Sequence, residues 1–227
     1  MNTLVKKLLP KMGLAEKRSF LQSQPMTKAV PIMRQSDEEL MSSYQAGDAM
    51  AFDVLLSRHK KPLYNFIYRF LHNEQAAEEA FQEVFMRVIR NRDEYRESAK
   101  FTTWIYTIAR NFCIDQLRKQ KFRNHKPLET ENDIQGDLLM TTEYRQSRDP
   151  QDFTMAKELE QHLEDALISL PAPQREVFLL RHFQNMPFEE IANVSDISVN
   201  TVKSRMRYAL QHIEKHFQSV GAMGVAV

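Results

Sequence analysis

Two predicted helices joined by a tight turn, within residues 187–217, constrain the fold of this chain more than any other feature. Glu189–Asn193 is predicted to form a short first helix. Asp196 follows where the chain must turn sharply, and aspartate tolerates a left-handed backbone better than most residues that carry a Cβ. Ser198 can cap the next helix by accepting a hydrogen bond from a free backbone N–H. The stretch is therefore predicted to be a helix–turn–helix.

The second of these helices has an apolar face and a donor-rich face. Its apolar residues recur at steps of three or four, which places them on one side. They are Val199, Val202, Met206, Leu210, Ile213 and Phe217. Opposite them, near the N-terminal end, lie Asn200, Lys203, Ser204 and Arg207. The first turns of a recognition helix reach base edges in the major groove, so this face is interpreted as a DNA-reading surface. The alternative is the solvated basic face of an ordinary amphipathic helix.

Composition indicates a mostly helical chain without disulfides. Hydrophobic residues make up 42% and charged residues 27%, which is ordinary for a soluble protein with an apolar core. Only five residues are glycine, whereas Glu, Gln, Leu, Arg, Lys and Ala are abundant. Cys113 is the only cysteine, which excludes an internal disulfide and a cysteine-rich zinc site. We expect it to be a small core residue.

The net charge of +1 results from segments of opposite sign. The segment charges are +6 for residues 1–34, −4 for 35–98, +6 for 99–126, −8 for 127–170 and +1 for 171–227. Such segregation favours local contact with phosphates over a uniformly basic surface.

No apolar run has the length needed to span a bilayer. The N-terminus contains Lys6 and Lys7 but lacks the continuous apolar core and small-residue cleavage site of a secretory signal. We therefore expect a cytoplasmic protein with no direct membrane insertion.

The predicted architecture is all-α, with two small helical domains. Organised structure is predicted to begin at Ser36, which has capping-box spacing with Glu39. A long acidic stretch without helical periodicity separates the domains, and its length argues against a single compact domain. The predicted parts are a flexible basic extension (1–34), a first domain (35–122), a flexible acidic linker (123–153), a second domain with the helix–turn–helix (154–218) and a tail (219–227).

Two long helices are predicted in the first domain. Gln75–Arg90 has an apolar side and a charged side, which is either a solvated face or a surface that receives a basic partner. Phe101–Lys121 has an apolar stripe that includes Trp104. Aromatic side chains beside basic ones suit single-stranded nucleic acid, but Trp104 shares its stripe with aliphatic residues, so core packing is favoured over base contact. That stripe consists of Phe101, Trp104, Ile105, Ile108, Phe112 and Leu117.

Three segments resemble a known family. They are AEEAFQEVFMRVIRN at 77–91, FTTWIYTIARNFCIDQLRK at 101–119, and LPAPQREVFLLRHFQNMPFEEIA at 170–192 with TVKSR at 201–205. In this order they resemble the extracytoplasmic-function (ECF) sigma factors of bacterial RNA polymerase. The resemblance implies region 2 in the first domain and region 4 in the second. It also implies a factor that binds core RNA polymerase and directs promoter-specific transcription initiation.

The resemblance further implies partners and site residues. The expected partners are core RNA polymerase, promoter DNA and an anti-sigma factor, with no enzyme activity, catalytic residue, cofactor or metal. Polymerase binding is implied for Glu79, Gln82, Glu83 and Phe85. Asn91–Lys100 corresponds to the loop that captures a flipped base of the −10 element. Contacts to the −10 element are implied for Tyr95, Arg96, Ser98, Lys100, Arg110, Asn111, Arg118 and Lys119.

For the −35 element, the resemblance implies reading by region 4. Its residues are Asn200, Lys203, Ser204 and Arg207, with Arg181 and Arg205 as phosphate contacts. The sequence departs from the family pattern in four places. Pro187 stands at a common capping serine, Ser195 at an apolar position, and Asp196 and Asn200 at two frequent glycines. Because Asn200 adds a side chain near DNA, the −35 preference of relatives is not expected to transfer.

Two other classes of protein account for part of the sequence. A promoter-binding repressor accounts for the helix–turn–helix but not for Phe101–Lys121 or the acidic helix before it. A nuclease or recombinase needs clustered carboxylates or a positioned nucleophile. His212 and His216 have i, i+4 spacing suited to a metal, but no third ligand is evident. No glycine-rich phosphate loop is present in the sequence.

Overall fold

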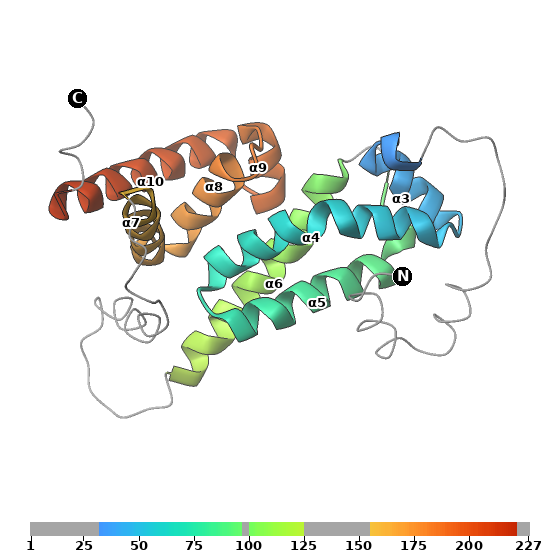
Figure 1. The fold of residues 1–227 in the computed structure, drawn as a ribbon, viewed down its shortest axis with the longest axis horizontal. Helices are drawn as coiled ribbons and strands as arrows, with labels where there is room; N and C mark the ends of the chain where they lie inside the picture. The colour runs from blue at the N-terminus through green and yellow to red at the C-terminus, as the bar shows by residue number, and fades with distance from the viewer. Residues whose placement is uncertain (1–31, 97–99, 125–154, 222–227) are drawn as a thin grey trace. The chain divides into compact units, whose positions relative to one another are not determined.

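The computed structural model describes residues 32–96, 100–124 and 155–221, and these residues form helices and no strand. The predicted all-α fold is confirmed (Figure 1). Most of the predicted N-terminal extension, Ser98 and most of the predicted linker lie outside the described residues. The elements are η2 (Ile32–Arg34), α3 (Asp37–Gln45), α4 (Ala49–Leu71), α5 (Glu74–Arg90), η3 (Arg92–Glu94), α6 (Phe101–Asn124), α7 (Met155–Ser169), α8 (Ala172–His182), α9 (Phe188–Ser195) and α10 (Val199–Ser219).

The chain divides into two compact units. The first is Met1–Ile67 with Gln75–Cys113, and the second is Tyr68–Glu74 with Ile114–Val227. The division passes through α4 and α6, which contribute residues to both units. The domain boundaries expected from the sequence stay a prediction. None of the described helices is sufficiently long and apolar to cross a membrane.

The first unit begins with the predicted capping box. The Ser36 hydroxyl accepts a hydrogen bond from the Glu39 backbone N–H at 3.1 Å, and the Glu39 carboxylate accepts one from the Ser36 N–H at 2.8 Å. Both bonds satisfy backbone donors that a helix start leaves free. The chain therefore enters α3 at a defined residue.

Aromatic packing joins the helices of the first unit. The rings of Phe52 in α4 and Phe85 in α5 are 6.3 Å apart and nearly perpendicular. Phe66 of α4 meets Tyr106 of α6 in the same way at 5.2 Å. Edge-to-face pairs of this kind add to the apolar area that the rings bury.

The apolar stripe of α6 differs from the predicted one. The buried residues are Phe101, Ile105, Tyr106, Ala109 and Cys113, whereas Trp104, Ile108, Phe112 and Leu117 are only half-buried. The core face is therefore rotated toward Tyr106 and Ala109. Cys113 is buried, as expected for a small core residue.

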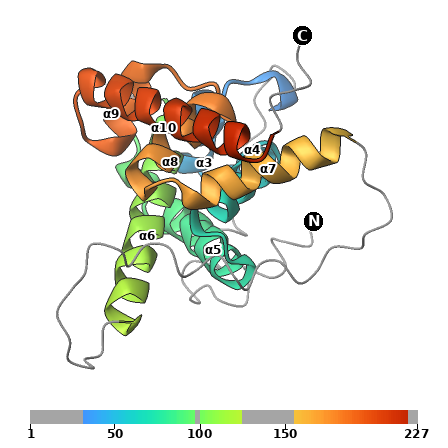
Figure 2. The same ribbon diagram turned by 90° about the vertical axis from the view of Figure 1, so that its left-hand side faces the viewer.

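The second unit contains the predicted helix–turn–helix. Asp196 ends α9 in the left-handed conformation, with φ 53° and ψ 51°. The Ser198 hydroxyl caps α10 by accepting a hydrogen bond from the Thr201 N–H at 3.1 Å. The long helix α10 packs on α7, α8 and α9, and both ribbon views show α7 beside it (Figures 1 and 2).

The predicted apolar stripe of α10 is wrong at one residue. Leu210 is 49% exposed, and the neighbouring Ala209 is fully buried in its place. Val202 and Ile213 are buried as expected, while Val199, Met206 and Phe217 are half-buried. Ala209 therefore lies on the buried side of α10, and Leu210 projects outward.

Candidate nucleic-acid interface

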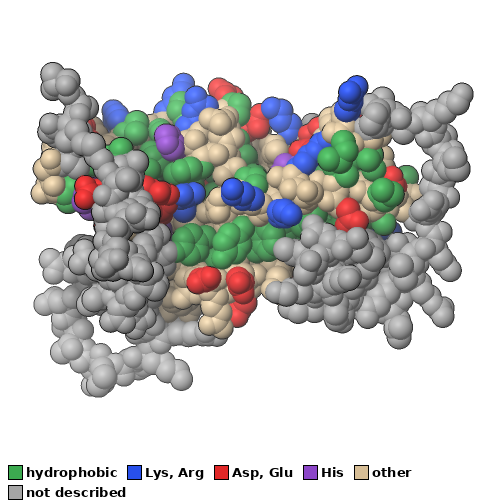
Figure 3. All heavy atoms as spheres, in the orientation of Figure 1, with side chains coloured by type: hydrophobic (Ala, Val, Ile, Leu, Met, Phe, Trp, Pro, Cys, Tyr) green, Lys and Arg blue, Asp and Glu red, His purple; other side chains and the backbone are tan. Residues whose placement is uncertain are grey.

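The start of α10 exposes the predicted donor-rich face. Asn200, Lys203, Ser204 and Arg207 are all exposed. Positions three and four apart lie on neighbouring turns of one helix face, so the four side chains form one patch. The Ser204 hydroxyl donates to the Asn200 carbonyl at 3.0 Å, within the helix. Figure 3, in the orientation of Figure 1, shows Lys and Arg side chains projecting over the region of α10.

Arg207 is oriented by its neighbour. Its guanidinium lies 5.1 Å from the centre of the Tyr208 ring, and one of its N–H groups reaches the Tyr208 hydroxyl at 3.4 Å. Cation–π contacts at exposed sites contribute about 0.5–1 kcal/mol. The tyrosine is 48% exposed, so both side chains remain accessible to a ligand.

The two predicted phosphate contacts differ in their surroundings. Arg205 is half-buried on α10. Arg181, near the end of α8, donates to the Met186 carbonyl at 3.1 Å and lies 5.1 Å from the Phe188 ring centre. Arg181 therefore holds the turn between α8 and α9, and only its remaining N–H groups can reach a phosphate.

A buried polar contact that sequence reasoning missed ties α9 to α8. The hydroxyl of Ser195 donates a hydrogen bond to the carboxylate of Glu176, and both residues are almost completely buried. The sequence shows Ser195 only as a polar residue at an apolar position of the family pattern. The matching signal was Glu176, a charged residue in the apolar run of α8. The pair fixes the first helix of the helix–turn–helix against its support.

In the first unit, the described flanks of the predicted −10 loop have contrasting exposure. Arg96 and Lys100 are exposed. Tyr95 is buried, with its ring 6.1 Å from Phe101 and 5.3 Å from Trp104. The expectation that Tyr95 contacts DNA is therefore corrected: its ring lies in an aromatic cluster, because η3 turns it inward. Trp104 lies half-buried in the same cluster, consistent with a packing role.

The predicted −10 residues on α6 form a strip along the helix. Asn111, Arg118 and Lys119 are exposed, and the steps of seven and eight residues place them on one side. Arg110 is half-buried and donates to the Asn111 side-chain carbonyl at 3.0 Å. Arg118 forms a 3.7 Å ion pair with Asp115 on the same side. The strip offers amide and guanidinium donors to an acidic or polar ligand.

The charged side of α5 contains the predicted polymerase-binding residues. Glu79 is exposed, with the Gln75 amide 3.5 Å from its carboxylate. Glu83 is half-buried and pairs with Arg87 at 3.2 Å and Arg90 at 3.7 Å. Gln82 is half-buried.

Phe85, the fourth residue predicted to bind polymerase, lies elsewhere. It is only 1% exposed, and its ring packs against those of Phe52 and Phe81. The predicted surface contact is therefore corrected. Position 85 falls on the buried side of α5, so Phe85 supports the acidic side from within the core.

The histidine pair of α10 is engaged in packing. The His212 ring nitrogen Nε2 lies 2.9 Å from the Ser169 hydroxyl of α7, and His216 lies 6.4 Å from the ring of His162. Burial, with the charges of His216 and Lys215, lowers the pKa of His212. Among the described residues, no group of three or more His, Cys, Asp or Glu side chains could hold a metal ion.

Comparison with known families identifies the family of this chain. The family model for Sigma-70 region 2 matches residues 55–123, and that for Sigma-70 region 4 matches residues 160–213. Together they cover more than half of the chain. The chain belongs to the ECF sigma factors. Region 2 is thus carried mainly by α4, α5 and α6, and region 4 by α7 to α10.

Individual relatives are similar along most of their length. The chain is 29% identical over 190 residues to the RNA polymerase sigma-H factor of Pseudomonas aeruginosa, which covers 82% of this chain and 96% of the relative. It is 28% identical to the ECF RNA polymerase sigma factor SigW of Bacillus subtilis, over 77% of this chain and 92% of the relative. The ECF sigma-E factor of Escherichia coli is also 28% identical, over 81% and 95%.

Two solved structures share the fold. One is that of CnrH in complex with the cytosolic domain of CnrY, with a TM-score of 0.59 and 22% identity over 82% of this chain and 99% of that one. The other is the sigma factor RpoE with the anti-sigma factor NepR from Bartonella quintana, with a TM-score of 0.55 and 22% identity over 74% and 96%. At this identity they establish the helical architecture alone.

Proposed function

We propose that this ECF sigma factor binds core RNA polymerase through α5, opens and reads the −10 element with α6 and the loop before it, and reads the −35 element with α10. The observation that best supports this division is that exposed donors gather on α6 and α10. These two helices belong to different regions, so each can meet its own part of a promoter. In this proposal, the sigma factor supplies promoter recognition and has no catalytic activity of its own.

At the −35 element, α10 would enter the major groove of duplex DNA. Lys203, Ser204 and Arg207 would reach base edges, because they extend from the first turns of the recognition helix. Asn200 would meet the groove one turn earlier. Arg205 and the free N–H groups of Arg181 would bind phosphates, which fix register without specifying sequence.

At the −10 element, the exposed strip of α6 would meet DNA where the strands part. Arg110 and Asn111 would act at the fork, with Arg118 and Lys119 on the backbone further along the helix. Arg96 and Lys100 would bind phosphates beside the base that leaves the stack. Extrusion of a base costs less where the duplex is already opening.

Docking on polymerase would use the acidic side of α5. Glu79 is its most accessible predicted contact, since Glu83 is already paired with two arginines. Opposite charges across an interface steer association and select the partner. Core polymerase would then hold both regions at a set spacing, so that the second DNA contact becomes effectively intramolecular.

A protein inhibitor is proposed as a further partner. Both solved structures described above contain a sigma factor or a similar chain bound to another protein, one of them an anti-sigma factor by name. An anti-sigma factor for this chain would block the polymerase or DNA surfaces. The proposed location is the cytoplasm, where RNA polymerase acts.

The repressor alternative predicts different behaviour in isolation. The segment that contains the helix–turn–helix, residues 171–227, has a net charge of +1, so it gains little from counterion release on DNA. We therefore expect the chain alone to bind promoter duplex poorly.

The deciding experiment is a gel-shift and run-off transcription series at fixed salt, with the chain alone, core polymerase alone and both together. The proposal predicts specific complexes and transcripts only from the mixture. Tight, sequence-specific duplex binding by the chain alone, unaffected by core polymerase, would favour the repressor instead.

A further inference from the structure

The short helix α3 contacts the described start of the −10 loop. The side-chain amide of Gln45, the last residue of α3, donates to the Arg92 carbonyl at 2.7 Å and to the Tyr95 carbonyl at 3.0 Å. The guanidinium of Arg92 also lies 5.5 Å from the ring centre of Tyr44 on α3. One side chain therefore uses both of its N–H donors to hold the turn that leads into the loop.

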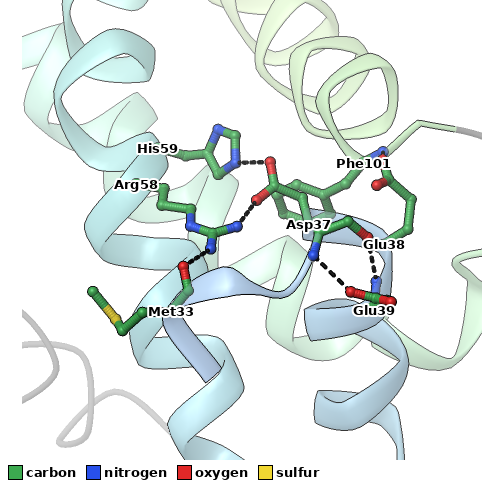
Figure 4. Close-up of polar contacts among 8 residues, drawn as sticks. Met33, Asp37, Glu38, Glu39, Arg58, His59 and Phe101 are labelled. Carbon is green, nitrogen blue, oxygen red and sulfur yellow. Dashed lines mark hydrogen bonds and ion pairs between the residues drawn. The ribbon is translucent and has the colours of Figure 1, made fainter. Parts of the chain in front are cut away.

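The other end of α3 contacts the described end of the loop. Glu38 accepts a hydrogen bond from the backbone N–H of Phe101, the first residue of α6, at 3.0 Å (Figure 4). The first N–H groups of a helix have no partner within the helix, and a carboxylate there also meets the positive end of the helix dipole. Glu38 thereby fixes the point at which the loop becomes α6.

The two contacts are held at a set separation. Glu38 and Gln45 are seven residues apart, which is about two helical turns or ~10 Å along one side of α3. Helix α3 thus holds the residues before the loop and the residue after it at a fixed separation. Neither contact involves residues close in sequence, since 47 to 63 residues separate the partners.

Helix α3 is itself fixed to α4. Asp37 accepts a 2.7 Å bond from Arg58 and lies 2.7 Å from the His59 ring nitrogen. Arg58 also donates to the Met33 carbonyl at 2.9 Å (Figure 4). The ring of His59 lies 5.2 Å from that of Phe101, so the same cluster supports the start of α6. Helix α3 is thereby tied to α4 and α6 in the first unit.

From these contacts we infer that Gln45 and Glu38 are positioning residues for −10 recognition. They set the distance and direction of the residues that flank the loop, including Arg96 and Lys100. A flank held in place before DNA arrives loses less conformational freedom on binding, so more of the contact energy distinguishes the correct base. The inference rests on the proposed assignment of this loop to the −10 element.

The test uses holoenzyme reconstituted from core polymerase and the full chain, with a promoter selected by the wild type from a randomised pool. Gln45→Glu keeps size and shape but removes both donors. Ala46→Glu, at the exposed neighbouring position, adds the same charge and leaves both hydrogen bonds intact. At the other end, Glu38→Ala removes the acceptor, and Glu38→Gln retains one. For each holoenzyme, transcription is measured on promoters with single −10 or −35 substitutions.

The inference predicts a selective loss at the −10 element. Gln45→Glu and Glu38→Ala should reduce discrimination against −10 substitutions by about tenfold, the size expected when hydrogen bonds to part-buried backbone groups are lost. Ala46→Glu should behave as wild type, and Glu38→Gln should recover most of the discrimination. Core affinity and −35 discrimination should change by less than about twofold, since contacts at separate sites act independently.

Two results would overturn the inference. One is unchanged −10 discrimination in Gln45→Glu. The other is a parallel loss at both elements that follows the unfolding temperature, because that pattern indicates general destabilisation. Arg96→Ala and Lys100→Ala separate this outcome from failure of the proposed function. If these variants lose −10 discrimination while Gln45→Glu keeps it, only the positioning role fails; if they do not lose it, the assignment of the loop fails as well.

Discussion

Regions 2 and 4 of this sigma factor present their proposed DNA contacts on differently built supports. In region 4, the residues proposed to contact DNA lie on the first turns of α10, and the helix itself fixes their spacing. In region 2, the proposed contact residues are divided between α6 and a loop. The residues that flank this loop are held by α3, which is far away in the sequence. A rigid helix suits duplex DNA of regular geometry, whereas a supported loop suits a base that has left the helix. The comparison teaches that a helix sets the spacing of its side chains by its own backbone, whereas the residues that flank a loop can be held by a helix distant in the sequence.

The largest expected effect concerns the acidic side of α5, which we propose docks on core polymerase. Glu79→Lys should abolish specific complexes and transcripts, since like charges facing each other across an interface cost several kcal/mol. Both regions should fail together, because each depends on docking. The measurement is core-binding affinity by fluorescence, followed by transcription. Glu74→Lys, also exposed on α5 but on another side of the helix, is the control. Equal defects from both changes would indicate a general charge effect.

The next effect should be confined to region 4. Ser195→Ala removes the hydroxyl that donates to buried Glu176, and a hydrogen bond to a charged group contributes about 1.5–3 kcal/mol. The free energy of unfolding of the second unit should fall by that amount, measured by denaturant titration with hydrogen exchange to separate the units. Ser219→Ala, which removes an exposed hydroxyl at the end of α10, should change little. A loss distributed over both units would contradict a local role.

Specificity within region 4 should separate base contacts from phosphate contacts. Arg207→Ala should cost about 1–3 kcal/mol of discrimination at one −35 position, the value of a good bidentate base contact. Arg205→Ala should weaken all promoters alike, because a phosphate contact does not read sequence. Selection from randomised −35 sequences measures both. Identical selected motifs for wild type and for Ala variants at Lys203, Ser204 and Arg207 would refute the assignment of the recognition face.

The smallest expected effect is a pH dependence of folding stability that arises from Asp37 on α3, in the first unit. Burial raises the pKa of Asp37, but the hydrogen bonds and charges of His59 and Arg58 outweigh it and hold the pKa below the ordinary value of 3.8. A lowered pKa means that the carboxylate stabilises the folded state above that value, and that this contribution is lost as the pH falls below it.

Unfolding titrations between pH 6 and pH 2 test this sign. The wild type should exceed Asp37→Asn in stability by a constant amount down to about pH 4, and the difference should shrink below it. A difference that instead grows toward low pH would show that the carboxylate is not held in its charged form.

Local signals in the sequence predicted much of the fold. The capping box of Ser36, the left-handed turn at Asp196 and the Ser198 cap each depend on residues within a few positions. The face of α10 followed from helical periodicity, except that Leu210 was placed inward instead of Ala209. A hydrophobic pattern favours the larger residue, but steps of seven and four residues from Val202 through Ala209 to Ile213 place the alanine on the buried side.

The site was less predictable where it depends on contacts between distant residues. Phe85 and Tyr95 were assigned to surfaces, but the orientation of α5 and η3 turns both inward. Gln45 and Glu38 gave no signal at all, because their partners lie 47 to 63 residues away. Glu176 and Ser195 each departed from an apolar pattern, yet only the fold shows that they meet.

The division of labour between the regions is tested most directly by comparing Asn111→Ala and Arg207→Ala holoenzymes on duplex and pre-melted promoters. Transcript yield is measured on both templates, with permanganate reactivity of −10 thymines to report opening of the duplex. Our account predicts that Asn111→Ala is defective on duplex DNA and largely rescued on the pre-melted template, whereas Arg207→Ala is equally defective on both. Equal defects of Asn111→Ala on the two templates, or none on either, would contradict it.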